Sequence, residues 1–328
     1  MAQTHYAIFR ETWPIRGGFS ISRGSKTIAE VIRIELTRNG KRGQGECVPY
    51  RRYGETLDGV EAALDGIRAE MEGGLGRAEL QALLPAGAAR NAVDCALWDL
   101  DAKLSDIPAW RTAGLPEPGP VITAFTISLA SPEIMAVAAA RAADRPLLKL
   151  KLGGDGDVER VQAVREAAPE ARLIVDANEA WSVEQVEALP PRLTKLGVEL
   201  IEQPLPAGAD AILDSVTSAV PLCADESFHG MADFAAMAGR YKAVNIKLDK
   251  AGGLTEALDL ARKAHDMGLE IMVGCMVGTS LAMAPAALLA GAARYVDLDG
   301  PLLLERDRVP GMTYQGSLMY PPPPALWG

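Results

Sequence analysis

Alternating apolar and polar residues mark the first regular element that the sequence predicts. Residues 31–37 (VIRIELT) alternate with a period of two and lead into the turn residues Asn39 and Gly40. This combination is typical of a strand that opens a β-hairpin. The short, glycine-rich segment 43–46 then predicts the returning strand.

The pattern changes to a helical period further along the chain. Apolar residues three and four positions apart predict helices over roughly residues 56–71 and 88–104. Strands followed by helices favour a small α+β domain over residues 1–115. Residues 116–120 (PEPGP) have the composition of a linker between this domain and the rest of the chain.

Residues 120–300 repeat a simpler unit. Short apolar runs alternate with helix-like segments, and successive runs begin about 25 residues apart, which is the length of one βα unit. Eight such runs predict a (β/α)₈-type barrel. An open, doubly wound sheet is the alternative, but it usually has fewer strands and often carries a glycine-rich phosphate loop, which is missing here. The predicted strands span residues 122–127, 147–151, 173–176, 198–202, 222–225, 243–247, 270–274 and 295–299.

Composition limits the classes of partner. The chain has 328 residues, which is enough for about two domains. It holds 33 Lys and Arg against 43 Asp and Glu, and this net charge of −10 argues against binding to nucleic acid or an anionic membrane. The longest apolar stretch, residues 280–293, contains Pro285 and predicts a buried helix rather than a membrane span. Residues 1–17 lack a secretory pattern and the four cysteines lack CxxC spacing, so a reduced, cytoplasmic protein is expected.

Charged residues stand at the ends of the predicted strands, where a barrel carries its catalytic groups. Asp176, Glu202 and Asp225 end three consecutive strands, and no histidine accompanies them. Three carboxylates brought together repel one another unless a cation joins them, and ligation by oxygen alone suits Mg²⁺. The alternative is three unrelated strand ends that water solvates.

Lysines occur at the ends of two other predicted strands, 147–151 and 243–247. Lys149 and Lys151 are two residues apart and therefore share a strand face, and Lys247 ends a strand that a barrel places opposite. Solvated surface lysines are the ordinary alternative. Two lysines inside a barrel predict a lowered ammonium pKa and a usable base. A metal ion between opposed lysines suits removal of an α-proton on one face and its return on the other.

Taken together, these segments resemble the enolase superfamily, its muconate-lactonising subgroup and, within that subgroup, the dipeptide epimerases. The resemblance extends over nearly the whole chain, and its motifs are specific in combination although each alone is weak. They are Gly43-Gln44-Gly45-Glu46-Cys47-Val48-Pro49, Lys149-x-Lys151, Asp176-x-Asn178, Glu202-Gln203-Pro204, Ala224-Asp225-Glu226-Ser227 and Lys247-x-Asp249-Lys250-x-Gly252-Gly253.

The resemblance implies an α/β fold made of a modified TIM barrel and a cap. A (β/α)₇β barrel would occupy residues 116–304. An N-terminal α+β capping domain would occupy residues 1–115, and residues 305–328 would return to complete it. The resemblance leaves open whether copies of the chain form a homo-oligomer.

The resemblance also implies roles for the strand-end residues. One Mg²⁺ per subunit would be bound by Asp176, Glu202 and Asp225. The acid and base catalysts would be Lys151 and Lys247, with Lys149 supporting the charge that develops on the substrate. Partners of the metal ligands and lysines would be Asn178, Glu226 and Asp249.

Candidate substrate-binding residues follow from the same comparison. Asp297-x-Asp299 resembles the acidic pair with which dipeptide epimerases hold the free ammonium of their substrate, and a period of two gives both residues the same orientation. Arg23, in a polar loop of the cap, would pair with a substrate γ-carboxylate, and Lys26 is the alternative. The other candidates are Thr123, Cys275 and Met276.

The expected function is therefore Mg²⁺-dependent epimerisation of a dipeptide, L-Ala-D/L-Glu from peptidoglycan turnover in particular. Within the superfamily, o-succinylbenzoate synthase, cycloisomerase and N-acylamino-acid racemase are alternatives, and none of these needs two acids for an ammonium group. A Schiff-base lyase that uses a barrel lysine is an alternative of another class. A non-catalytic binding protein is the third.

Overall fold

A long β-hairpin opens the chain. In the computed structural model, which describes residues 3–328, β1 (His5–Ile21) pairs antiparallel with β2 (Gly24–Arg38), and β2 pairs with β3 (Lys41–Cys47). The predicted strand 31–37 is confirmed within β2. The sequence pattern missed β1, because its register with β2 shifts between Pro14 and Phe19 and its alternation is interrupted there.

Helices pack on this sheet to form the cap. The predicted helix 88–104 is confirmed as α4 (Ala88–Ser105), whereas the predicted helix 56–71 is two helices separated at Ile67. A side chain at Gly45 of β3 would collide with the backbone of α4, which explains the glycine-rich returning strand. The cap helices are η1 (Arg51–Tyr53), α1 (Leu57–Gly66), α2 (Arg68–Glu72), α3 (Arg77–Leu83), α4 and α5 (Ala109–Thr112).

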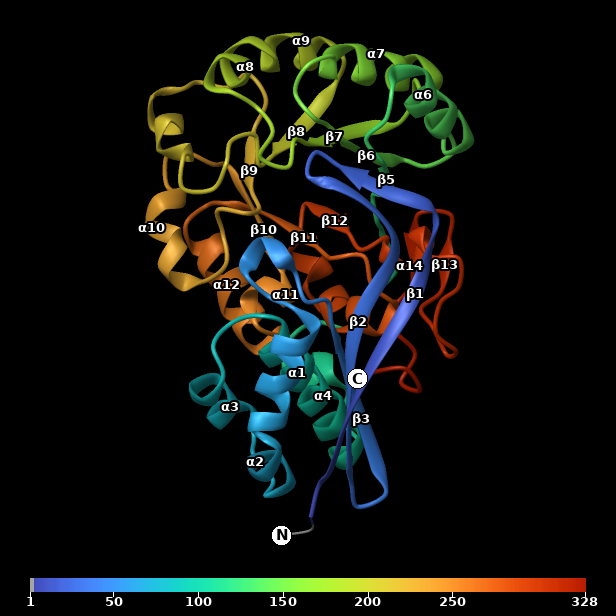
Figure 1. Cartoon of the computed structure of the whole chain (residues 1–328), viewed down its shortest axis with the longest axis vertical. Helices are drawn as coiled ribbons and strands as arrows, with labels where there is room; N and C mark the ends of the chain where they lie inside the picture. The colour runs from blue at the N-terminus through green and yellow to red at the C-terminus, as the bar shows by residue number, and fades with distance from the viewer. Residues whose placement is uncertain (1–2) are drawn as a thin grey trace.

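Eight parallel strands form the second unit (Figure 1). They follow chain order around the sheet, and the backbone N–H of Ala124 donates to the carbonyl of Val296 at 2.7 Å, which joins the first strand segment to the last. The predicted (β/α)₇β barrel with its cap is confirmed. The strands are β5 (Phe125–Ile127), β6 (Leu147–Lys151), β7 (Arg172–Asp176), β8 (Val198–Glu202), β9 (Leu222–Ala224), β10 (Ala243–Lys247), β11 (Glu270–Gly274) and β12 (Tyr295–Asp297).

Helical segments connect each barrel strand to the next and cover the barrel's outer face. Their apolar faces pack on outward-pointing strand residues such as Leu148 and Leu150. They are α6 (Pro132–Arg141), α7 (Asp157–Ala167), α8 (Val183–Ala188), α9 (Pro190–Lys195), η2 (Asp210–Ser215), η3 (Met231–Asp233), α10 (Phe234–Met237), α11 (Leu248–Ala251), α12 (Leu254–Asp266), α13 (Ser280–Ala286) and η4 (Ala287–Ala292), with α14 (Gly300–Leu303) after the last strand.

The barrel interior explains why the strand ends carry the chemistry. A buried apolar layer fills the barrel interior, and each strand, or the residue next to it, contributes one side chain to this layer. The barrel is therefore closed below the strand ends. Because side chains alternate along a strand, the next inward positions above this layer include Lys149, Asp176 and Glu202. The layer consists of Ala124, Leu147, Ile174, Leu200, Cys223, Ala243, Met272 and Tyr295.

Two predicted elements are divided in the structure. The run 122–127 is not one strand: β4 (Val121–Ile122) pairs with β14 (Leu318–Met319), which pairs with β13 (Tyr314–Gln315), and only β5 enters the barrel. The stretch 280–293 is largely buried as far as Ala290, but it forms α13 followed by the 3₁₀ helix η4, and Gly291 and Ala292 are exposed. Pro285 lacks the N–H that a continuous α-helix needs there.

The C-terminal segment contacts the cap. Glu305 donates its N–H to the carbonyl of Pro14, the Trp327 indole donates to the carbonyl of Cys95, and the Gly328 N–H donates to Asp99. These contacts support the proposed return of residues 305–328 to the cap. Among residues 3–328, none of the helices combines the length and the apolar character needed to span a bilayer.

Candidate active site

Three carboxylates meet at the carboxyl ends of β7, β8 and β9. Asp176, Glu202 and Asp225 each offer an oxygen, and these oxygens lie within 4.8 Å of one another. All three side chains are buried. Parallel neighbouring strands end at the same rim, so the local sequence order Asp, Glu, Asp becomes one spatial cluster.

The pKa values of Glu202 and Asp176 shift in opposite directions in this crowded cluster. Burial, together with the negative charges of Asp176 and Asp225, raises the pKa of Glu202 to about 7. Burial alone would also raise the pKa of Asp176, but Lys151 and Lys149 hold it below its usual range. The cluster therefore carries more negative charge than its surroundings readily stabilise.

Lys149 lies at the centre of the acidic groups. Its ammonium is 2.6 Å from Glu202, 2.7 Å from Asp297 and 3.3 Å from Asp176. Burial alone would lower the pKa of Lys149, but these carboxylates raise it well above its ordinary value. Lys149 is only 1% exposed, and it therefore serves as a fixed positive charge beneath the carboxylates.

Two further lysines flank the cluster from opposite strands. Lys151 Nζ is 2.6 Å from Asp176, and Lys247 Nζ is 2.7 Å from Asp225. Three strands separate β6 from β10 in either direction around the eight-stranded barrel, so the two strands lie opposite each other. The lysines thus reach the carboxylates from opposing walls.

The lowered ammonium pKa predicted within the pair Lys149 and Lys151 is wrong for Lys149, and the pKa of Lys247, which that prediction did not cover, is raised as well. Burial alone would lower the pKa of Lys247, but Asp225 and Glu202 raise it well above its ordinary value. The prediction counted desolvation and like charges and omitted the attraction of three nearby acids. That attraction weakens when the acids bind a cation.

Other groups that support the carboxylates were missed in the sequence. Asn245 donates to Glu202 at 2.7 Å, and Lys250 donates to the Asp225 carboxylate at 2.6 Å. The side-chain oxygen of Gln203 accepts from the backbone N–H groups of Asp225 and Ser227. Asn245 was identifiable, because it lies two residues before Lys247 and therefore on the same face.

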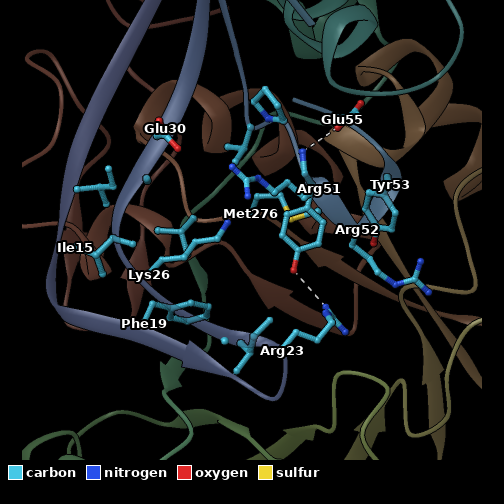
Figure 2. A pocket seen from close by; sticks show the side chains of 18 of the residues that line it. Ile15, Phe19, Arg23, Lys26, Glu30, Arg51, Arg52, Tyr53, Glu55 and Met276 are labelled. Atoms are coloured by element: carbon cyan, nitrogen blue, oxygen red, sulfur yellow. Dashed lines mark hydrogen bonds between the residues drawn. The ribbon is translucent and has the colours of Figure 1, made fainter. Parts of the chain in front are cut away.

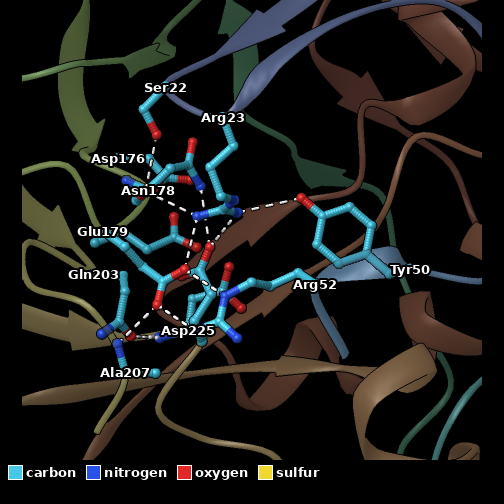
Figure 3. Close-up of polar contacts among 12 residues, drawn as sticks. Ser22, Arg23, Tyr50, Arg52, Asp176, Asn178, Glu179, Gln203, Ala207 and Asp225 are labelled. Atoms are coloured by element: carbon cyan, nitrogen blue, oxygen red, sulfur yellow. Dashed lines mark hydrogen bonds and ion pairs between the residues drawn. The ribbon is translucent and has the colours of Figure 1, made fainter. Parts of the chain in front are cut away.

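Asn178 and Glu226 lie where the resemblance implied, beside the metal-binding cluster. Asn178 donates its backbone N–H to Asp176 at 2.9 Å, and its side-chain amide is 3.4 Å from Glu226. Figure 3 shows Arg23 reaching from the cap toward Asn178. Its guanidinium is 2.6 Å from Glu226 and also donates to the Asn178 carbonyl and the Tyr50 hydroxyl.

A cavity of about 1060 Å³ lies above the cluster, between the barrel mouth and the cap. Lys151, Lys247, Cys275 and Met276 line its barrel side, and the β1–β2 hairpin and the η1 segment line its cap side. Figure 2 shows Lys26 on the inner side of the hairpin, facing this space. Among residues 3–328, no carboxylate lies within 4 Å of the Lys26 ammonium, which contacts the Tyr50 ring instead.

The other predicted substrate residues lie deeper. Asp297 accepts from Lys149, and its second oxygen is buried without a hydrogen-bond partner. Asp299 accepts from the Thr126 N–H, and burial followed by the charge of Asp297 raises the pKa of Asp299 to about 7. Thr123 is fully buried and accepts from the Leu298 N–H, so it joins the first strand segment to the last and does not line the cavity.

The structure brings Asp249 to a different place from the one implied. Its carboxylate accepts from the Val48 N–H at 3.0 Å and from the Asn91 amide at 2.8 Å, and both donors belong to the cap. Burial raises the pKa of Asp249 to about 7. Asp249 therefore connects α11 to the cap and does not contact the lysines or the three carboxylates.

This position predicts a pH-dependent stability change. The folded protein keeps Asp249 protonated up to about pH 7, whereas the unfolded chain ionises it near pH 4. As the pH rises from 4 to 7, the free energy of unfolding therefore falls by about 1.4 kcal/mol per pH unit, and above pH 7 this contribution stays constant. Asp249→Asn should lack this loss, so its melting temperature should rise relative to wild type from pH 4 to 7 and then stay parallel. An equal difference at every pH would contradict the assignment; Asp259→Asn, on an exposed helix face, is the control.

Residues 3–114 match the family described as mandelate racemase / muconate lactonizing enzyme, N-terminal domain. Residues 134–315 match the family described as enolase C-terminal domain-like. The chain belongs to the mandelate racemase and muconate lactonizing enzyme family. Its cap and barrel are the two domains by which this enolase-superfamily fold is defined.

Three proteins illustrate its place in the family. An L-Ala-D/L-Glu epimerase of Escherichia coli K12 is 46% identical over 94% of this chain and 96% of the relative. An N-acetyl-D-glutamate racemase of a Pseudoalteromonas species is 48% identical over 87% of this chain and 91% of the relative. A crystal structure of an enolase family member from Agrobacterium tumefaciens, with bound sodium and L-Ala-L-Glu, aligns with a TM-score of 0.97 at 51% sequence identity. The alignment covers 99% of this chain and 100% of that chain.

The donor set of this family member fits a hard divalent cation. Three buried carboxylates supply oxygen ligands, and the raised pKa of Glu202 indicates that an additional positive charge would be stabilising. Two more buried oxygens near the cluster, Asn178 Oδ1 and Glu226 Oε2, have no hydrogen-bond partner among the described residues. The residues present therefore match the chemistry of Mg²⁺.

Proposed function

We propose that this protein is a Mg²⁺-dependent dipeptide epimerase that inverts the α-carbon of the C-terminal residue, with L-Ala-D/L-Glu as its substrate. The observation that carries the proposal is the pair Lys151 and Lys247, each within 2.7 Å of a different carboxylate of the cluster and each from an opposite barrel wall. Dipeptide epimerases of known structure bind Mg²⁺ together with a dipeptide.

In this mechanism Asp176, Glu202 and Asp225 would hold Mg²⁺. The ion, when bound, would stabilise negative charge that develops on the substrate carboxylate. One of the two flanking lysines, Lys151 or Lys247, removes the α-proton, and the other delivers a proton to the opposite face. Lys149 stays charged beneath the site and supports the same negative charge.

The two ends of the dipeptide have separate candidate partners. We propose that Asp297 and Asp299 attract the free ammonium group, since Asp297 has one buried oxygen without a hydrogen bond. Lys26 faces the cavity without an acidic partner and is proposed, with Arg23, to attract the side-chain carboxylate. The D-glutamyl dipeptide is a peptidoglycan building block, so a role in cytoplasmic cell-wall recycling is part of the proposal.

Racemisation of an N-acylated glutamate is the second candidate. The Pseudoalteromonas relative, an N-acetyl-D-glutamate racemase by name, favours it, and the lysines and carboxylates would act in the same way. Such a substrate has no ammonium group, so it would not use Asp297 and Asp299. A Schiff-base lyase on Lys151 or Lys247 is the candidate of another class, and it is disfavoured because the relatives named above are an epimerase and a racemase.

One pair of substrates separates the two candidates. In D₂O, the wild-type enzyme should incorporate deuterium at the glutamyl α-carbon of L-Ala-L-Glu and L-Ala-D-Glu much faster than into N-acetyl-D-glutamate, as read by mass spectrometry. Asp297→Asn should lower kcat/KM for the dipeptides by roughly 10- to 100-fold, the loss expected for one charged hydrogen bond. Losses of equal size for the dipeptide and the N-acetyl compound would eliminate the ammonium-binding role.

A further inference from the structure

A short loop after β7 connects the metal-binding cluster to the cap. Asn178 and Glu179 both have positive φ values, 44° and 68°, which are unfavourable for residues other than glycine. Two hydrogen bonds hold them there: Asn178 N–H donates to the Asp176 carboxylate, and Glu179 N–H donates to the Gln203 carbonyl, both at 2.9 Å. This backbone conformation directs Glu179 toward the cap.

The Glu179 carboxylate contacts two arginines of the cap. Arg52 donates to both carboxylate oxygens, at 2.7 and 2.8 Å, and Arg23 donates to one of them at 3.0 Å. The backbone N–H of Ala207 donates a fourth hydrogen bond at 2.7 Å. The Glu179 side chain is only 8% exposed, so these charged hydrogen bonds are partly shielded from water.

The two arginines come from the two cap segments that line the cavity (Figures 2 and 3). Arg23 lies at the turn between β1 and β2, and Arg52 lies in η1. Ser22, beside Arg23, donates to the Asn178 carbonyl at 2.9 Å. The loop 178–179 is thus a common attachment point for both segments at the mouth of the cavity.

We propose that Glu179 is a positioning residue that latches both cap segments over the cavity and thereby determines how tightly the substrate is retained. Its effect on substrate rests on the proposed function, whereas its effect on the cap segments does not. The two attachments are unequal, because Arg23 also binds Glu226 and the Tyr50 hydroxyl. Among the described residues, Glu179 is the acidic partner of Arg52 within 4 Å, and no second one is found.

The test combines limited proteolysis with kinetics. Glu179→Gln removes the negative charge and keeps the shape of the side chain. Trypsin cleavage after Arg51 or Arg52 should become roughly tenfold faster, and cleavage after Arg23 or Lys26 should increase less, as followed by mass spectrometry. KM for L-Ala-L-Glu should rise roughly tenfold while kcat stays within about twofold of wild type, since the reacting groups are untouched.

A matched control is available on the barrel. Glu199→Gln breaks the pair between Arg172 and Glu199, which has similar bidentate geometry but lies at the start of β7 and in β8, away from the cavity. It should change neither the cleavage pattern in the cap nor KM. Arg52→Gln removes the main attachment from the cap side together with the trypsin site after Arg52. If Glu179→Gln does not fold, this variant should reproduce the rise in KM and the faster cleavage after Arg51.

Separate outcomes bear on the latch and on the proposed function. Wild-type cleavage rates in both folded variants would overturn the latch, whatever reaction the enzyme catalyses. Faster cleavage with unchanged KM would overturn its role in substrate retention. If wild-type enzyme does not epimerise the dipeptide, the proposed function fails, and the cleavage rates still decide whether Glu179 latches the cap.

Discussion

Lys247→Ala should abolish epimerisation while leaving α-proton exchange from one of the two substrate configurations. General acid or base catalysis contributes roughly 10²- to 10⁴-fold, so turnover should fall by that factor. The remaining lysine, Lys151, still faces one side of the α-carbon and can remove and return a proton there. Incubation of L-Ala-L-Glu and L-Ala-D-Glu separately in D₂O, followed by NMR, distinguishes exchange from inversion.

Lys151→Ala supplies the matched test. It should show the opposite preference, exchanging only the configuration that Lys247→Ala cannot. Full inversion in either variant, or the same preference in both, would refute the assignment of one lysine to each face. Both substitutions remove a buried cation that pairs with an acid, so melting temperatures should be measured alongside to establish that the variants fold.

The second large effect concerns the metal ion. Mg²⁺ at 100 times its dissociation constant should stabilise wild type by about 2.7 kcal/mol, a rise in melting temperature of several degrees that chelator removes. Glu202→Gln removes one ligand charge, so this rise should largely disappear and activity should fall by at least about 100-fold. In chelator the variant should be no less stable than wild type at pH 8, because burial and two neighbouring acids already disfavour ionised Glu202.

A substitution elsewhere on β8 is the control for Glu202→Gln. Glu199→Gln, which changes a half-buried carboxylate on the same strand, should keep the full Mg²⁺-dependent rise. If Glu202→Gln retained the same Mg²⁺-dependent rise as wild type, the ion would be bound elsewhere. If chelator left both the melting temperature and the activity of wild type unchanged, the metal dependence itself would be wrong.

The barrel and its central chemistry were predictable because they depend on local patterns. Strand alternation alone places Lys149 and Lys151 inside and Leu148 and Leu150 against the helices. Once the strands are parallel and adjacent, their terminal acids must converge at one rim. Successive strands begin about 25 residues apart, and this regular spacing made the strand order evident.

The cap and its contacts were less predictable, because they depend on tertiary arrangement. Arg52 meets Glu179 across 127 positions of sequence, and no local pattern pairs them. Asp249 sits two residues after a catalytic candidate, yet its side chain points to the cap because α11 begins at Leu248 and changes the direction of successive side chains. Similarly, Asp299 lies beyond β12, at the residue that precedes α14, and does not extend the strand.

The lysine pKa values show a different limit. Sequence spacing indicated which charges gather, but the sign of a pKa shift depends on whether desolvation or attraction is larger. Around Lys149, three acids lie within 3.3 Å, and their attraction exceeds the desolvation effect. Deciding which of the two effects is larger requires the distances between the charged groups, and the sequence alone does not give them.

The central claim is that a divalent ion bound by three acids holds a substrate between two opposed amines. A crystal structure with Mn²⁺ in place of Mg²⁺ and L-Ala-L-Glu bound, with anomalous scattering to locate the ion, tests it most directly. The account predicts an ion ligated by Asp176, Glu202 and Asp225, with Lys151 and Lys247 on opposite faces of the glutamyl α-carbon. An ion bound elsewhere, or both amines on one face, would contradict it.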